Sequence, residues 1–155
     1  MIVYKVVQIV GGCLYSAVLG PRNPASVIYS LNEKAVAAVS GTPLFAFESL
    51  DSARDFVRGI CSVLRRRGVS IGIMKCEAEK SVWRPYQLPR RVRISVSEYW
   101  DRMQVLGFGV FFDTEPLPKG TVLCYSITPE KVESVSHLVG MDIVESVPSY
   151  QGAWS

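Results

Sequence analysis

Gly68-Val69-Ser70-Ile71-Gly72 has the Gly-x-Ser-x-Gly pattern that carries the nucleophilic serine of α/β-hydrolases. Asp101 or Asp113, followed by the only histidine, His137, would complete a serine, acid and histidine series in the order of that family. A nucleophile elbow needs a strand that runs into a helix, whereas the periodicity here predicts a helix that runs into a strand. We therefore interpret the pattern as the entry of a strand and not as a catalytic serine.

Paired acidic side chains are the second kind of candidate for chemistry. Glu77 and Glu79 share one face of a predicted strand, where two carboxylates could hold a divalent cation as nucleases require. The chain contains no Asp/Glu-x-Lys tripeptide, so a solvated strand face is the preferred interpretation. Glu98 and Asp101 lie one helical turn apart, where acidic side chains favour the positive end of a helix. Neither pair indicates general acid and base catalysis.

Four cysteines, Cys13, Cys61, Cys76 and Cys124, stand far apart with no Cys-x-x-Cys and no histidine at ligand spacing. We interpret each as a small core residue and predict no metal site, although their even number leaves a disulfide open. The glycine patterns of phosphate and dinucleotide loops are absent, so no cofactor is predicted. These observations favour a protein that is not an enzyme.

Charge is the most informative feature of the sequence. The net charge is +3, but residues 1–53, 54–93 and 94–155 carry 0, +8 and −5. Guanidinium groups bind phosphate oxygens and aromatic faces accept unstacked bases, so an arginine-rich segment with interleaved aromatic residues suits nucleic acid. The predicted binding residues for nucleic acid or another polyanion are Arg65, Arg66, Arg67, Trp83, Arg84, Tyr86, Arg90, Arg91 and Arg93.

A purely structural explanation of the same charges stays open. Arg65 to Arg67 would complement the negative end of the preceding helix, and Arg91 and Arg93 would protect an edge strand. The basic middle of the chain would then face its acidic last third, within one fold or across a homo-oligomer.

The elements that must position these residues start with a β-rich first third. Ile2–Ile9 and Cys13–Val18 flank Gly11-Gly12 and predict a hairpin. Further strands are expected at 26–31, 44–47, 69–79, 92–94, 110–112, 121–127 and 141–147, and residues 35–39 are compatible with a strand or a short helix.

Three helices are expected between the strands. From Asp51 the apolar residues recur with helical period, with Ser49 or Asp51 as the N-cap and Gly68 as the stop. A capping box at 95–98 predicts a second helix to Leu106, and Thr128-Pro129-Glu130 predicts a third that ends at Gly140 and exposes His137. The predicted fold class is α+β, a single domain over residues 1–147 with a largely antiparallel or mixed sheet and about three helices, followed by a tail at 148–155.

Composition places the chain among folded, soluble proteins. Hydrophobic residues make up 48% and charged residues 20% of 155 positions, which disfavours disorder. The apolar start meets Gly11-Gly12 too early for a signal peptide, and no stretch reaches the roughly 20 apolar residues of a membrane-spanning helix. We expect a cytoplasmic protein without a membrane partner.

Three groups of residues resemble one family. They are Tyr4-Lys5-Val6-Val7 with Leu14-Tyr15-Ser16-Ala17-Val18, Leu44-Phe45-Ala46-Phe47 before a helix, and Leu117-Pro118-Lys119-Gly120-Thr121-Val122-Leu123 before Ser126-Ile127-Thr128-Pro129. Together they look like small proteins of phages, archaeal viruses and mobile elements, over most of residues 4–132. The resemblance implies a viral or mobile-element origin, with the cytoplasm of the host cell as the location. It carries over no catalytic residue and no activity.

These observations lead to one functional hypothesis and two alternatives. The hypothesis is a viral or mobile-element accessory protein that does not catalyse, and whose basic central segment binds nucleic acid or an acidic protein surface. The first alternative is a small enzyme whose pocket would be assembled from Tyr4, Tyr15, Trp83, Glu77 and Glu79. The second is a structural or assembly protein that forms homo-oligomers.

Overall fold

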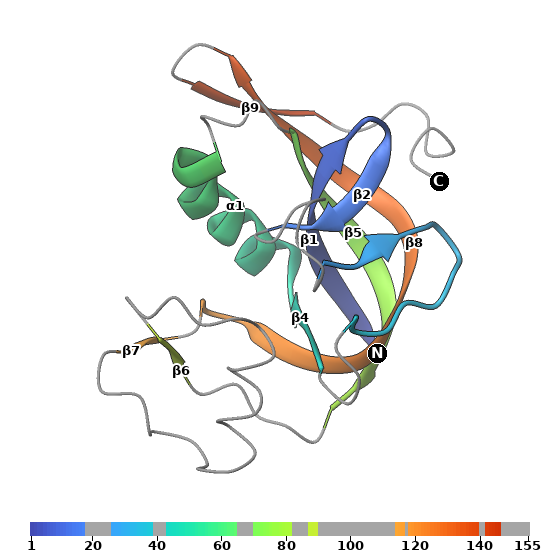
Figure 1. The fold of residues 1–155 in the computed structure, drawn as a ribbon. Helices are drawn as coiled ribbons and strands as arrows, with labels where there is room; N and C mark the ends of the chain where they lie inside the picture. Colours follow the sequence, from blue (N-terminus) through green and yellow to red (C-terminus); the bar gives the residue numbers. More distant parts are fainter. Residues whose placement is uncertain are drawn as a thin grey trace.

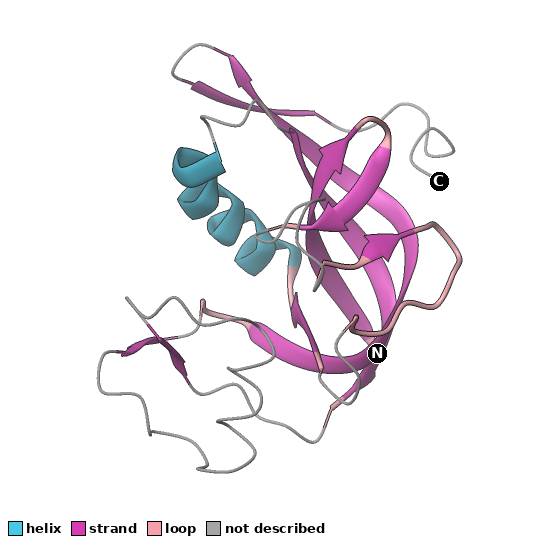
Figure 2. Cartoon of the chain, in the orientation of Figure 1, coloured by secondary structure: helices cyan, strands magenta, loops and turns pink. Residues whose placement is uncertain are grey.

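The described part of the protein is built mainly from β-strands and contains a single helix (Figures 1 and 2). The computed structural model describes residues 1–17, 26–38, 43–64, 70–81, 87–89, 114–116, 118–139 and 142–146. In chain order the elements are β1 (Ile2–Val10), β2 (Cys13–Ser16), β3 (Ile28–Tyr29), β4 (Leu44–Phe47), α1 (Leu50–Leu64), β5 (Ser70–Lys80), β6 (Gln87–Pro89), β7 (Thr114–Pro116), β8 (Thr121–Val139) and β9 (Asp142–Ser146). The expected α+β fold with about three helices is therefore wrong.

Four strands close into a ring. β1 pairs with β5, β5 with β8, β8 with β4, and β4 returns to β1 through Tyr4 and Phe47. All of these pairings are antiparallel, and β2, β3 and β9 extend the ring at its margins. A sheet closed on itself removes its edges, so these strands form a small antiparallel barrel. Figure 1 shows β8 curving around β1 and β5.

The β1–β2 hairpin confirms the prediction from the glycine pair. Gly11 and Gly12 have φ of 58° and 79°, the left-handed conformation that a two-residue type I′ turn requires at both positions. The register then places Val10 opposite Cys13 and Val7 opposite Ser16.

Helix α1 confirms the second strong prediction and lies against the outside of the barrel (Figure 2). Ser49 is its N-cap, because the Ser49 hydroxyl accepts a hydrogen bond from the Ser52 amide at 3.1 Å. The buried helix residues Ala53 and Val57 pack in one cluster with side chains from β1, β4 and β5: Val6, Phe47, Ile71 and Ile73. Burial of each large apolar side chain stabilises the fold by about 1.5–3 kcal/mol.

Strand β8 replaces the third expected helix. The cap signal at Thr128-Pro129-Glu130 is local, whereas residues 124–136 pair with β5 over most of its length. Lys75 lies opposite Lys131 and Cys76 opposite Pro129, so Glu130 is the extra residue of a bulge. The bulge accommodates a proline that would otherwise interrupt the ladder, and Pro129 in turn accepts a hydrogen bond from the Asn32 amide at 2.7 Å.

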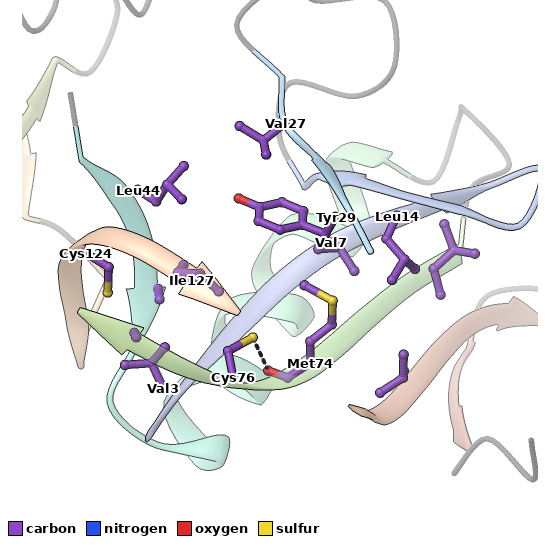
Figure 3. Close-up of a cluster of buried hydrophobic side chains, with 14 of the residues drawn as sticks. Val3, Val7, Leu14, Val27, Tyr29, Leu44, Met74, Cys76, Cys124 and Ile127 are labelled. Carbon is purple, nitrogen blue, oxygen red and sulfur yellow. Dashed lines mark hydrogen bonds between the residues drawn. The ribbon is translucent and has the colours of Figure 1, made fainter. Parts of the chain in front are cut away.

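The two faces of β5 follow the expected alternation. Met74, Cys76 and Ala78 point into the barrel and are buried, while Glu77 and Glu79 point outward and are exposed. Figure 3 shows the interior, where Tyr29 lies among Leu44, Val7 and Leu14. This interior is the larger of the two hydrophobic clusters of the described residues.

The remaining expectations have mixed outcomes. The strand at 44–47 is confirmed to the residue, and that at 141–147 is confirmed as β9. The strand at 26–31 shortens to β3, and within residues 35–39 Ala35 forms one bridge to Ile127. The helix at 95–106, the strands at 92–94 and 110–112, Gly68 and the tail at 148–155 lie outside the described residues. Within the described ranges, no helix has the length and apolar character needed to cross a bilayer.

Candidate functional site

The arginine-rich residues are attached to the two ends of β5. All nine predicted binding residues lie outside the described ranges, so the structure gives only the points where their segments join the barrel. The segment with Arg65 to Arg67 lies between the end of α1 at Leu64 and the start of β5 at Ser70. The segment with Trp83 to Arg93 follows β5 after Lys80. An eleven-residue strand is about 33 Å long, so the two attachment points are far apart.

The described part of the molecule is slightly acidic. It carries 8 basic and 11 acidic side chains, whereas the remaining residues carry 9 basic and 3 acidic ones. Several described cations are also paired. Arg54 lies 3.0 Å from Glu145, Arg58 lies 2.8 Å from Asp55, and Lys131 lies 3.3 Å from Glu133. The positive charge is thus concentrated in the residues outside the described ranges.

The pocket expected from Tyr4, Tyr15, Glu77 and Glu79 does not form among the described residues. Tyr4 packs with the helix cluster, and Tyr15 lies opposite Gln8 near the other end of β1. Glu77 and Glu79 are exposed, and the Glu77 carboxylate accepts a hydrogen bond from the amino group of Met1. Trp83 lies outside the described residues.

The Gly-x-Ser-x-Gly pattern has a structural role, as expected. Ser70 begins β5, and a Cβ on Gly72 would lie 3.0 Å from Cδ1 of Ile9, so the glycine allows close packing of β1. His137 lies on β8 and not on a helix, which corrects its expected surroundings. No group of three or more metal-ligating side chains occurs among the described residues.

A cluster of four chemically reactive side chains lies inside the barrel. Val3, Val7 and Ile9 of β1 point into the interior core, and Lys5 has the same parity. The Lys5 ammonium approaches the Tyr29 ring to 5.8 Å from its centroid and interacts electrostatically with the Cys76 and Cys124 thiols. We call Lys5, Tyr29, Cys76 and Cys124 the interior cluster.

Lys5 is the unusual member of the interior cluster. Its Nζ donates a hydrogen bond to the main-chain oxygen of Phe45 at 2.5 Å, and the described residues supply no carboxylate within 4.0 Å of it. Removal of the ammonium from water lowers the pKa of Lys5 from 10.5 to about 8. A lysine with such a pKa has a substantial fraction of nucleophilic neutral amine near neutral pH.

The two thiols of the interior cluster have the opposite character. Burial raises the pKa of Cys76 to about 12, and it also raises the pKa of Cys124. Both thiols therefore stay protonated and are poor nucleophiles, as expected of small core residues. Cys13 is exposed, which corrects its expected burial, and Cys13, Cys76 and Cys124 are all free.

Tyr29 contributes a buried hydroxyl without a hydrogen-bond partner. The residue is 2% exposed, and burial raises the pKa of its phenol. The Ser16 hydroxyl lies near enough to lower that pKa, but the two hydroxyl groups do not meet the distance and angles of a hydrogen bond. An unsatisfied buried hydroxyl costs about 1–3 kcal/mol, so a polar guest inside the barrel would relieve it.

The interior cluster is not predicted by any motif of the sequence. Its only sequence signal is a lysine at the third of five alternating positions, Met1, Val3, Lys5, Val7 and Ile9, where the others are apolar. In an open sheet that lysine would be read as a surface residue. Comparison of the chain with protein-family models, curated protein sequences and solved structures finds no match.

Proposed function

We propose that this chain is a non-catalytic binding protein that uses its arginine-rich segments on nucleic acid. The observation that carries the proposal is the separation of charge between the slightly acidic described part and the remaining residues, which hold 9 of the 17 basic side chains, seven of them in the two arginine-rich segments. Arginine neutralises phosphates, and each neutralised phosphate releases counterions. Trp83 and Tyr86 in the same segment favour single strands, whose bases are free to stack.

The barrel serves in this proposal as a rigid support. Its two attachment points for arginine-rich segments lie at opposite ends of β5, whose length along the chain is about 33 Å. A single strand that is stacked at about 3.4 Å per nucleotide needs about ten nucleotides to cover that length. The proposal places the protein in the cytoplasm, and in the host cell if the chain has the viral or mobile-element origin that its resemblance implies.

The test compares two charge-removing variants of the full chain. One changes Arg84, Arg90, Arg91 and Arg93 to Gln, and the other changes Arg65, Arg66 and Arg67 to Gln. A control changes three exposed basic residues of the described part to Gln, as many as the second variant: Lys34, Arg58 and Lys119. Binding of a fluorescent 20-nucleotide single strand is followed by anisotropy at fixed salt.

We expect the first variant to lose at least about 10-fold in affinity and the control to lose less than about 3-fold, because only the segment residues contact phosphates. A loss in the second variant as well indicates a ligand that reaches both ends of β5. Equal losses in the control and in the first variant would contradict the proposal, since the affinity would then reflect only net charge. Binding of an acidic protein but of no oligonucleotide would also contradict it.

A further inference from the structure

Lys5 has the three properties of a lysine that reacts covalently. It lies in the barrel interior without a carboxylate partner among the described residues, and its one hydrogen bond is to the Phe45 carbonyl. The residue as a whole is half-buried, but its ammonium group is withdrawn from water beside Tyr29, Cys76 and Cys124. An ammonium held in this way is poorly stabilised relative to the neutral amine.

The surrounding groups leave the amine as the strongest nucleophile of the interior cluster. Burial keeps the Cys76 and Cys124 thiols protonated, and it raises the pKa of the Tyr29 phenol as well. The Tyr29 hydroxyl has a free donor, because it makes no hydrogen bond in the described part of the chain. A small ligand with an electrophilic carbon could react with the Lys5 amine, and a hydrogen-bond acceptor on the same ligand could bind the Tyr29 hydroxyl.

We propose that Lys5 is a covalent binding site for a small aldehyde or ketone, whose oxygen accepts a hydrogen bond from the Tyr29 hydroxyl. The amine lone pair forms a bond to the carbonyl carbon, and the carbonyl oxygen takes up a proton to give a carbinolamine. Loss of that oxygen as water, with a proton from nitrogen, leaves an imine. The step needs no oxidant or reductant, and it is independent of nucleic-acid binding.

The test uses reductive trapping on the intact chain. The protein is incubated at pH 7.5 with a limiting amount of glycolaldehyde and with cyanoborohydride, which reduces the imine to a stable secondary amine. Peptide mass spectrometry then gives the modification rate of every lysine in one sample. Lys34, which is exposed, is the internal reference, so the comparison needs no variant.

We expect Lys5 to be modified at least about 10-fold faster than Lys34. At pH 7.5 about one quarter of an amine with a pKa of 8 is neutral, compared with about one thousandth for a pKa of 10.5, and the lower basicity offsets part of that advantage. A rate for Lys5 equal to or below that of Lys34 would overturn the proposal.

A conservative variant tests the part assigned to Tyr29. Tyr29→Phe removes only a hydroxyl that has no hydrogen-bond partner among the described residues, so the fold should be retained. We expect it to slow the modification of Lys5 by about 3-fold or more and to leave Lys34 unchanged. An unchanged rate at Lys5 would show that the Tyr29 hydroxyl does not contact the carbonyl oxygen, and it would overturn the role proposed for Tyr29.

Discussion

Lys5 donates a hydrogen bond from its Nζ to the main-chain oxygen of Phe45 at 2.5 Å, and so connects β1 to β4 from the inside of the barrel. The two strands otherwise pair only through Tyr4 and Phe47, so this side-chain bond lies where the ring of strands closes. The same contact holds a positive charge away from water. Lys5 therefore stabilises the closure through its hydrogen bond and weakens the fold through the desolvation of its charge.

The stability of the protein should rise with pH just above neutrality. The pKa of Lys5 is lowered from 10.5 to about 8, so between these values the unfolded chain binds more protons than the folded chain, and the free energy of unfolding increases with pH. Cys76 and Cys124 act in the opposite direction above about pH 9, because their thiols ionise only after unfolding. Between pH 7.0 and 8.5 the contribution of Lys5 is the larger one, because most unfolded thiols are still protonated below their ordinary pKa of 9.0.

Urea denaturation at these two pH values measures the effect. We expect the free energy of unfolding to be about 0.5 kcal/mol higher at pH 8.5 than at pH 7.0. The Lys5→Met variant retains a long side chain without the charge and should show no rise. A rise of the same size in wild type and variant would assign the effect to another group.

Gly120 should be the least replaceable of the described glycines. Its φ is 81°, and a Cβ would lie 2.7 Å from Cβ of Ser52 at the start of α1. Gly120→Ala therefore combines backbone strain with a steric clash, and we expect a loss of at least about 2 kcal/mol in the free energy of unfolding.

Gly59 on α1 is the matched control for Gly120. A Cβ there meets nothing within 4 Å, and alanine is the better helix former, so Gly59→Ala should stabilise the protein by about 0.5–1 kcal/mol. Thermal or urea denaturation measures the free energy of unfolding of both variants. If Gly120→Ala does not lower the free energy of unfolding, residues 118–120 do not pack against the start of α1 as the structure shows.

Ser49 should account for the N-terminal stability of α1. Its hydroxyl accepts from the Ser52 amide and also hydrogen-bonds to the Ser52 hydroxyl at 2.9 Å. We expect Ser49→Ala to lower the free energy of unfolding by about 1 kcal/mol. Asp51, the other predicted cap, is exposed, and among the described residues its ion pair is with Arg54 at 3.9 Å, so Asp51→Ala should cost less than about 0.5 kcal/mol. The opposite ranking, measured by urea denaturation, would make Asp51 the cap.

Sequence predicted the elements whose causes are local. The β1–β2 hairpin depends on Gly11-Gly12, and α1 depends on a serine cap followed by a helical apolar stripe, so both signals lie within about 15 neighbouring residues. The alternation in β5 is equally local, since it needs only one buried face. These patterns could be read without knowledge of any partner strand.

Sequence failed where pairing between distant residues decides the structure. The cap signal at Thr128-Pro129-Glu130 favours a helix, but β5 supplies hydrogen-bond partners for that segment, and burial of Ile127, Val132 and Val135 adds to the strand. Closure of the ring depends on the pairing of β4 with β8, and no local sequence pattern predicts that pairing. Because closure turns one face of β1 into an interior, the position of Lys5 could not be predicted either.

The salt dependence of oligonucleotide binding by the wild-type chain is the most direct test of the proposed function. If about four arginines neutralise phosphates of a single strand, the affinity should fall about 50-fold between 50 and 200 mM salt. Fluorescence anisotropy with a 20-nucleotide single strand measures this change. A steep fall of that size is the predicted result, whereas an absence of binding at 50 mM salt, or an affinity that does not change with salt, would contradict nucleic-acid binding.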